Sequence, residues 1–148
     1  MLARPTTDAV IRGIVNDLNG LIAPALDDES AKVALGMIVQ LLQGCAVRAA
    51  HEIAWMHDEI AAIEAAVADI DDEPVCSALA AERAAAGGLD LVDVVARYDL
   101  ASRALSAGIE AAYANGDAEL VESLRRLLEA RSGHEMQIVG ALALVGRG

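Results

Sequence analysis

Apolar positions separated alternately by four and three residues dominate the middle of the chain. The alternation continues without interruption for about five heptads, through Leu35, Val39, Leu42, Ala46, Ala49, Ile53, Met56, Ile60, Ile63, Val67 and Ile70. This spacing places side chains on one face of an α-helix and is typical of a coiled-coil-like seam. The pattern therefore predicts one long helix from Ser30 to Ile70.

The length of this helix sets a geometric problem. At about 1.5 Å per residue it extends about 60 Å, whereas a compact chain of this size has a radius of gyration of only about 15 Å. We expect that the helix either bends, near Gly36 or Gly44, or reaches another subunit.

Shorter patterns predict helices on both sides of the long one. The first covers residues 7–22, with apolar positions Ile11, Ile14, Leu18 and Leu21 and a threonine cap. An alanine-rich helix opens with Asp71-Asp72-Glu73-Pro74 and stops at Gly87-Gly88. A further seam follows, through Leu91, Val95, Tyr98, Ser102, Leu105, Ile109 and Ala112, and ends at Asn115-Gly116.

Asp117 is the expected cap of the last helix, whose apolar positions continue to Leu128. Ser132 and Glu135 have capping-box spacing, so this helix is expected to break there and restart. Together these elements predict an all-α fold, a four- to five-helix bundle built around the long second helix, in a single domain of residues 1–148.

Composition and charge narrow the classes of partner. The chain is 55% hydrophobic but has no Phe, and alanine makes up about a fifth of it, so the core should be thin. A homodimer is expected because a thin core gains from burial between subunits. The formal charge of −12 opposes binding to nucleic acid and to anionic lipid surfaces.

The longest stretch without a charged residue, Val33–Val47, is shorter than a membrane span. The N-terminus has no signal-peptide pattern. We therefore expect a cytoplasmic protein without a membrane partner, in which Cys45 and Cys76 are free thiols.

The segment HEIAWMHDEI, residues 51–60, concentrates groups that a metal or catalytic site would use. On a helix, however, His51 and His57 lie about 120° apart around the axis and about 9 Å apart along it. None of the chain's histidines has an Asp, Glu, Cys or His at the offsets that a helical metal site uses. We predict no metal, no cofactor and no catalytic residue.

Trp55 is the more informative residue because its ring points away from the seam and needs a surface to cover it. Arg48, His51 and Asp58 share its side of the helix. This group either packs within the bundle, forms an interface, or lines a ligand pocket.

A second polar group, Arg131, His134 and Glu135, interrupts the last apolar seam. It either binds an anion or a carboxylate from inside the bundle, or belongs to a capped helix break without further function.

The first 45 or so residues carry a resemblance to a known family, through Arg4-Pro5-Thr6, Ala23-Pro24-Ala25-Leu26 and the segment KVALGMIVQLL. Here the chain resembles small uncharacterised bacterial helical proteins encoded beside aminoglycoside-phosphotransferase-like kinases and acyl-CoA dehydrogenases. The resemblance implies an accessory role, with an enzyme as partner, and assigns no catalytic residue.

The leading hypothesis is thus a non-catalytic accessory or protein-interaction helical bundle rather than an enzyme. The alternative is a binder of a small apolar or acyl ligand between helices, suggested by Trp55, Met37 and Met56. Metal-dependent catalysis is a third hypothesis.

Overall fold

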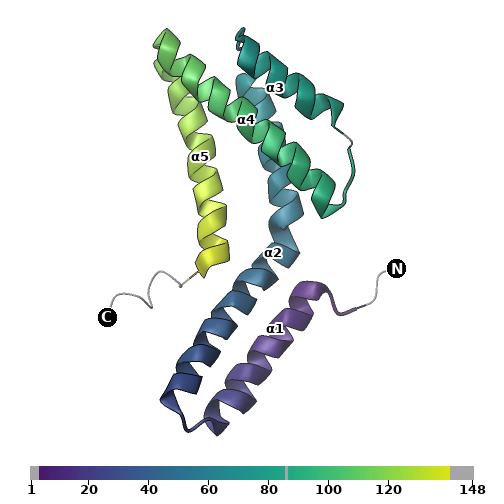
Figure 1. The fold of residues 1–148 in the computed structure, drawn as a ribbon, viewed down its shortest axis with the longest axis vertical. Helices are drawn as coiled ribbons and strands as arrows, with labels where there is room; N and C mark the ends of the chain where they lie inside the picture. The colour runs from purple at the N-terminus through teal and green to yellow at the C-terminus, as the bar shows by residue number, and fades with distance from the viewer. Residues whose placement is uncertain (1–3, 86, 141–148) are drawn as a thin grey trace. The chain divides into compact units, whose positions relative to one another are not determined.

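The computed structural model describes residues 4–85 and 87–140, and in these two ranges the regular elements are all helical (Figure 1). They are α1 (Thr7–Asp17), the π-helix η1 (Leu18–Ile22), the 3₁₀ turn η2 (Ala23–Ala25), α2 (Glu29–Val67), α3 (Glu73–Ala84), α4 (Leu91–Asn115) and α5 (Ala118–Val139). The predicted all-α fold around a long second helix is confirmed.

Several helix ends follow the predicted local chemistry. The backbone N–H of Ser30 donates to Asp28 Oδ1 over 2.8 Å, and that of Leu120 donates to Asp117 Oδ1 over 3.0 Å. These carboxylates satisfy N–H groups that lack a partner within the helix. Gly116 ends α4 with φ of 68°, the left-handed conformation that glycine adopts without steric cost.

The chain divides into two compact units, which we name the hairpin unit and the core unit. The hairpin unit contains residues 1–52 and 134–148, and the core unit contains residues 53–133. Helices α2 and α5 contribute to both units, because their residue ranges cross the boundaries.

The core unit is organised around one buried cluster to which α2, α3, α4 and α5 all contribute. Its members are Ile60, Ile63, Val67, Val75, Leu79, Ala101, Ala104, Leu105, Ala112 and Leu124. The helices approach closely: a Cβ added at Gly108 would lie 2.9 Å from Val67 Cγ1. Alanine and glycine on α4 therefore give the thin core that the composition predicts.

The buried face of α4 differs from the predicted seam. Leu91 and Val95 are 45% and 39% exposed, whereas Val94 is fully buried. Small residues line the buried face farther along, including Ala101, Ala104 and Gly108. Their small apolar area makes this face weak in a hydrophobic pattern, although it packs most closely.

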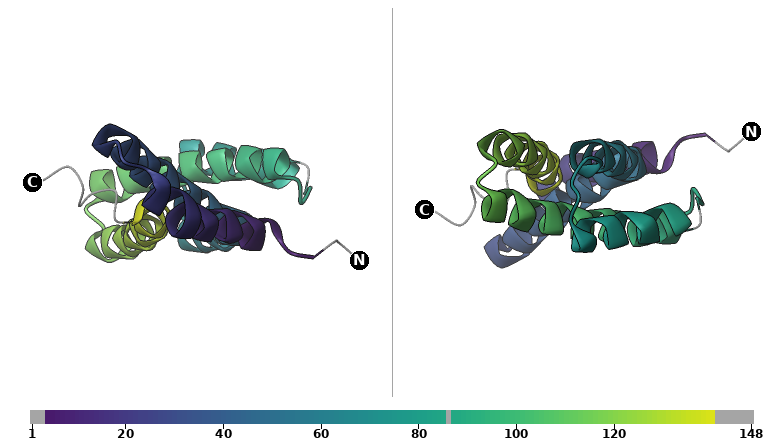
Figure 2. Two further views of the ribbon diagram at one scale, coloured as in Figure 1. Left: turned by 90° about the horizontal axis from the view of Figure 1, so that it is seen from below. Right: turned by 90° about the horizontal axis from the view of Figure 1, so that it is seen from above.

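The hairpin unit contains α1 packed beside the first half of α2, as two differently oriented views show (Figure 1, Figure 2). Its buried cluster consists of Val15, Leu35 and Val39. Four partly buried residues pack against these three: Leu18, Ala23, Leu26 and Leu42. Short connecting residues 26–28 make α1 and α2 an antiparallel pair.

The seam of α2 is buried at its two ends and exposed in the middle. Leu35, Val39 and Ala46 are buried in the hairpin unit, and Ile60, Ile63 and Val67 in the core unit. Ala49 and Ile53 are exposed.

The helix is continuous through Gly36 and Gly44. Gly44 serves a close approach instead, since a Cβ there would lie 2.8 Å from the carbonyl oxygen of Ile138.

The predicted break in the last helix is wrong. Helix α5 continues from Ala118 to Val139 through Ser132 and Glu135. Side-chain contacts of Arg131 explain why this segment remains helical, as described below.

Candidate functional site

The four candidate residues around Trp55 are divided between the two units. Arg48 is exposed and its Nη1 donates to Glu52 Oε1 over 3.0 Å on the same helix. His51 and Asp58 are also exposed, and Trp55 is half-buried. The boundary between the two units falls after Glu52, so Arg48 and His51 belong to the hairpin unit while Trp55 and Asp58 belong to the core unit.

Residues 51–60 also contribute no metal centre. Within the described ranges no group of three or more His, Cys, Asp and Glu side chains is placed to hold a metal ion. Nε2 of the half-buried His57 lies buried without a hydrogen-bond partner.

Arg131 faces into the core unit, as required by the interpretation that it binds an anion or a carboxylate from inside the bundle. Its Nε donates to Glu59 Oε1 over 2.5 Å and its Nη2 donates to Ser102 Oγ over 3.1 Å. Tyr98 Oη donates to Glu59 Oε2 over 3.0 Å, and the guanidinium carbon of Arg131 lies 5.1 Å from the Tyr98 ring centroid.

This polar cluster joins α2, α4 and α5. The carboxylate that Arg131 could have recruited from a ligand is already supplied by Glu59, whose side chain is only 10% exposed. The cluster is thus an internal cross-link between three helices. His134 is half-buried and Glu135 is exposed, and both belong to the hairpin unit.

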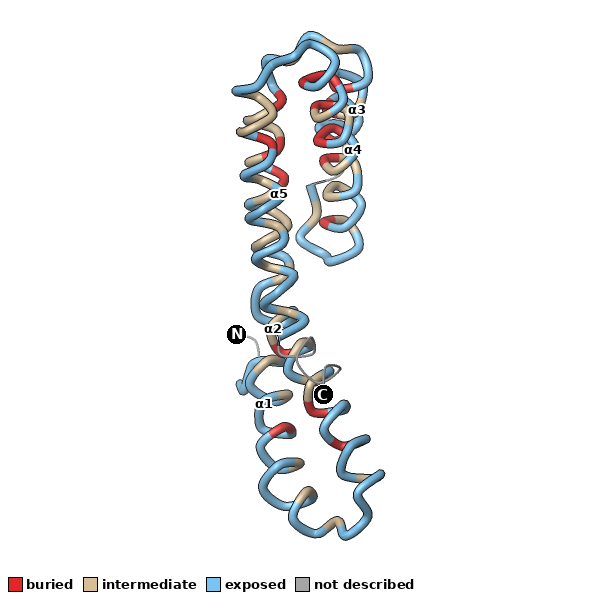
Figure 3. Tube along the Cα trace, turned by 90° about the vertical axis from the view of Figure 1, so that its left-hand side faces the viewer, coloured by how far each residue is buried: buried red, intermediate tan, exposed pale blue. Residues whose placement is uncertain are grey.

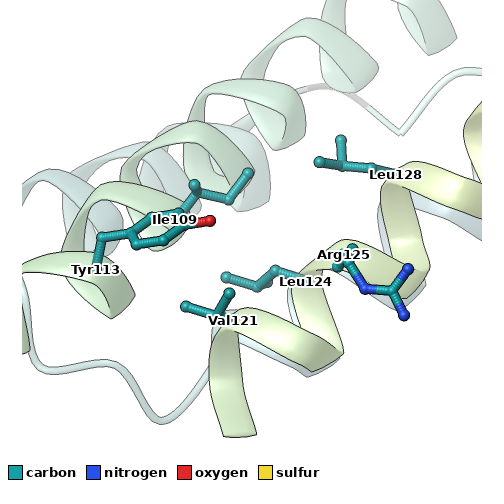
Figure 4. A pocket seen from close by; sticks show the side chains of 6 residues that line it. All are labelled: Ile109, Tyr113, Val121, Leu124, Arg125 and Leu128. Carbon is teal, nitrogen blue, oxygen red and sulfur yellow. The ribbon is translucent and has the colours of Figure 1, made fainter. Parts of the chain in front are cut away.

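The core unit has two hollows that bear on the acyl-ligand alternative, one small and one with an acidic rim. Ile109, Tyr113, Val121, Leu124, Arg125 and Leu128 line a mainly apolar hollow of about 100 Å³ between α4 and α5 (Figure 4). Small-molecule sites usually enclose about 300–1,000 Å³. A wider hollow of about 330 Å³ is rimmed by Asp69, Asp117 and Glu119, which would repel a fatty-acid carboxylate.

Arg125, which lines the smaller hollow, forms ion pairs along α5. Arg125 donates hydrogen bonds to Glu122 and Glu129. Its hydrogen bond lowers the pKa of the Glu122 carboxyl below its ordinary value, and these carboxylates raise the pKa of Arg125. All three side chains are about half exposed, so this network contributes little to stability.

The most unusual surface lies on the hairpin unit. Among the described residues of this unit, ten large apolar side chains are between 45% and 72% exposed: Val10, Ile14, Leu21, Ile22, Val33, Met37, Ile38, Leu41, Met136 and Val139. Figure 3 shows that buried positions are sparse along α1 and the first half of α2. An apolar concentration of this kind marks an interaction surface more often than chance exposure does.

The exposed side chains on α2 follow a second seam. The inner seam of α2 is Leu35, Val39, Leu42 and Ala46, with spacings of four, three and four. One residue earlier, Ala34, Ile38, Leu41 and Cys45 repeat the same spacings and are all exposed. We call this second series the outer seam of α2.

Helix α1 and the π-helix η1 that follows it also have an inner and an outer seam. Their inner seam is Ile11, Val15 and Leu18, which are buried or half-buried. The outer seam is Val10, Ile14, Asp17 and Leu21, again one residue earlier and exposed. The apolar positions that predicted this helix therefore divide between the two seams, with Ile11 and Leu18 in the inner seam and Ile14 and Leu21 in the outer one.

The two outer seams lie on one side of the hairpin. A shift of one residue turns a side chain by about 100° around the helix axis. In both helices the outer seam precedes the inner seam by one residue, so both outer seams are rotated in the same sense about their own helix axes. Because the two helices are antiparallel, this rotation away from their line of contact brings both outer seams to the same side of the pair.

The opposite side of the hairpin is mainly polar, with the exposed Val33 as an apolar exception. Arg12 and Asn16 of α1, and Lys32 and Gln43 of α2, fall there and are exposed. The hairpin is thus amphipathic as a whole, with an outer face formed by the two outer seams.

Charge separates the two units as well. The hairpin unit has five Lys or Arg against seven Asp or Glu, a formal charge of −2. The core unit has six against sixteen, a formal charge of −10. The outer face of the hairpin therefore belongs to the weakly charged unit, although large apolar side chains are exposed in both units.

Helix α2 is also the one described helix that is long and apolar enough to cross a membrane by length and composition. An 18-residue window within it has a mean hydropathy of 1.5, and 22% of that window is buried. The sequence criterion of an uncharged stretch did not detect it. Such a window also occurs in core helices of proteins outside membranes.

Comparisons with family models, with curated proteins and with solved structures find no match to this chain.

Proposed function

We propose that the protein is a non-catalytic accessory protein that works by binding other protein chains, with an enzyme among its partners. The observation that carries this proposal is the outer face of the hairpin. It gathers large apolar side chains on one side of an amphipathic helix pair, in the unit with the smaller net charge.

The chemistry of the outer face supports a protein partner. Helix-in-groove and helix-on-helix recognition use apolar side chains at spacings of three and four, and both outer seams have these spacings. Protein interfaces have an apolar centre with few charges and a polar rim. The outer face has such a centre in Ile14, Ile38 and Leu41, and Arg48 follows at its end.

A binding experiment tests the proposal directly. The full chain is co-expressed with an aminoglycoside-phosphotransferase-like kinase or with an acyl-CoA dehydrogenase, the two enzyme classes that the sequence resemblance implies, and complexes are measured by size-exclusion chromatography with light scattering. A stoichiometric complex that alters the enzyme's stability or kinetics is expected. If none of these enzymes binds, or if the purified chain alone turns over their substrates, the proposal is wrong.

A further inference from the structure

We infer that the outer face of the hairpin packs against the outer face of a second copy of this chain, so that two α1–α2 hairpins form a four-helix bundle. This inference rests on the proposed function in that it assigns the outer face to protein binding. It goes further by naming the occupant.

The angle between the inner and outer seams fits a bundle of this kind. In a four-helix bundle each helix packs against two neighbours, and its apolar surface must face both. Seams shifted by one residue are about 100° apart on a helix. The inner seams pack α1 against α2 within one chain. The outer seams are then available to pack against the two helices of a second copy.

The hairpin also needs a further layer to bury its apolar side chains. Its cluster contains only Val15, Leu35 and Val39 as buried residues. Helix pairs achieve stable packing when a sheet or other helices cover their remaining apolar face. A second hairpin with the same outer face covers it symmetrically, in the isologous arrangement that most homodimers use.

The size of the outer face suits a dimer of moderate affinity. Its five large apolar side chains, Val10, Ile14, Leu21, Ile38 and Leu41, are each between 45% and 68% exposed, and contiguous apolar patches larger than a few hundred Å² are rare on monomers. A standard interface buries about 800 Å² on each partner. Ala34, Cys45 and the polar rim supply the remaining area.

Charge favours association through this unit over the other one. Two copies each carry −12, so contact between core units at −10 is strongly opposed. The hairpin units meet at −2 each. A lipid surface fits less well, because Asp17 lies within the outer seam of α1 and anionic headgroups repel an acidic chain.

Light scattering across protein concentration, from micromolar to hundreds of micromolar, tests the inference on the full chain. The wild-type protein should change from monomer to dimer. Ile38→Glu combined with Leu41→Glu should raise the dissociation constant at least about a hundredfold, since it places charges in the apolar centre of the face.

The matched control adds the same charge on the other side of the same helix. Gly36→Glu combined with Gln43→Glu changes exposed positions, and a Cβ at Gly36 meets no atom within 4 Å. This control should dimerise like the wild type. Equal loss of dimer in both variants would show a general charge effect and overturn the inference.

Cysteine alkylation provides a second readout that does not depend on substitutions. Cys45 lies in the outer seam of α2, whereas Cys76 lies in the core unit, and both are exposed. Alkylation of Cys45 should slow as protein concentration rises through the dimerisation range, while that of Cys76 should not change. Mass spectrometry of the two peptides measures both rates in one sample.

Three results would overturn the inference. A monomer at all concentrations would do so, as would Cys45 alkylation that does not depend on concentration. Co-sedimentation of the monomer with neutral phosphatidylcholine vesicles, lost in the Ile38→Glu/Leu41→Glu variant, would assign the face to lipid.

The proposed function would fail in a different way. A monomer whose enzyme complex is lost in this variant would keep the accessory role but reassign the face to the enzyme. A dimer that binds no enzyme would keep the inference and reject the enzyme partner.

Discussion

The core unit buries ten residues in one cluster from four helices, whereas the cluster of the hairpin unit has three buried residues. The core unit carries a formal charge of −10 and the hairpin unit −2. A closed core lets a domain carry many like charges on its surface, because association is not needed for its stability. The hairpin leaves an apolar seam uncovered and needs another chain to bury it. Its low net charge permits that contact.

Two isoleucines of α2 give the largest expected difference between the units. Ile63 is 0% exposed in the core unit and Ile38 is 50% exposed in the hairpin unit. Ile63→Ala should lower the free energy of unfolding by about 4 kcal/mol because it leaves a cavity. Ile38→Ala should change the stability of the monomer by about 0.5 kcal/mol. Urea unfolding at low protein concentration measures both, and equal losses would contradict the comparison.

Two arginines of the core unit separate a buried ion pair from an exposed one. Arg97 Nη2 lies 2.5 Å from Oε1 of Glu82, whose side chain is 2% exposed. Arg97→Ala should cost about 3 kcal/mol of stability because the carboxylate stays buried without its partner. Arg83→Ala removes the exposed pair with Glu64 and should cost less than about 1 kcal/mol. Thermal and urea unfolding of the two variants test this order.

The polar cluster should contribute less, because its members also have other partners. Arg131→Ala should cost about 2 kcal/mol by removing the main partner of Glu59. Arg126→Ala, at a side chain 71% exposed on the same helix, is the matched control and should be nearly neutral. A neutral Arg131→Ala variant would indicate that Arg131 is kept for a ligand and not for the fold.

A single substitution in the hairpin unit should strengthen the dimer. Asp17 occupies an apolar position of the outer seam and is exposed. Asp17→Leu should lower the dimer dissociation constant about tenfold, which corresponds to about 1.4 kcal/mol, since it completes the seam. Asn16→Leu, on the polar side of α1, should leave that constant unchanged. Light scattering of both variants provides the measurement.

The smallest expected effect concerns the exposed network on α5. The hydrogen bond from Arg125 lowers the pKa of Glu122. The carboxylate therefore stabilises the folded chain above its unfolded pKa, and this contribution is lost as pH falls through the lower folded pKa. An NMR titration should show the lowered value, and Arg125→Gln should return it towards the ordinary one.

The sequence predicted those features that depend on neighbours along one helix. The capping carboxylate of Asp117, the terminator Gly116 and the apolar seam of α2 were all visible in the spacing of residues, although the seam is exposed at Ala49 and Ile53. The outer seams were visible too, because they repeat the inner spacing one residue earlier. They were not recognised because exposed and buried apolar residues look alike in a sequence.

Features that depend on contacts distant in sequence were not predictable. The capping-box spacing of Ser132 and Glu135 favoured a break in α5. The helix nevertheless continues through these residues, and the neighbouring Arg131 pairs with Glu59, 72 residues away. The alanine and glycine face of α4 was missed for a related reason. Its burial depends on how closely Val67 and other neighbours approach, which local hydrophobicity does not encode.

The unbroken course of α2 has a consequence for how the two units respond to each other. Its middle turns, around Ala49 and Ile53, are exposed and belong to neither buried cluster, so their backbone hydrogen bonds depend on helical turns at both ends. Local unfolding of the helix that starts in the hairpin unit, whose cluster has fewer buried residues, can extend along these turns as far as the buried cluster of the core unit. Whatever binds the hairpin would thus slow amide hydrogen exchange at residues it never touches, transmitted by the helical backbone alone.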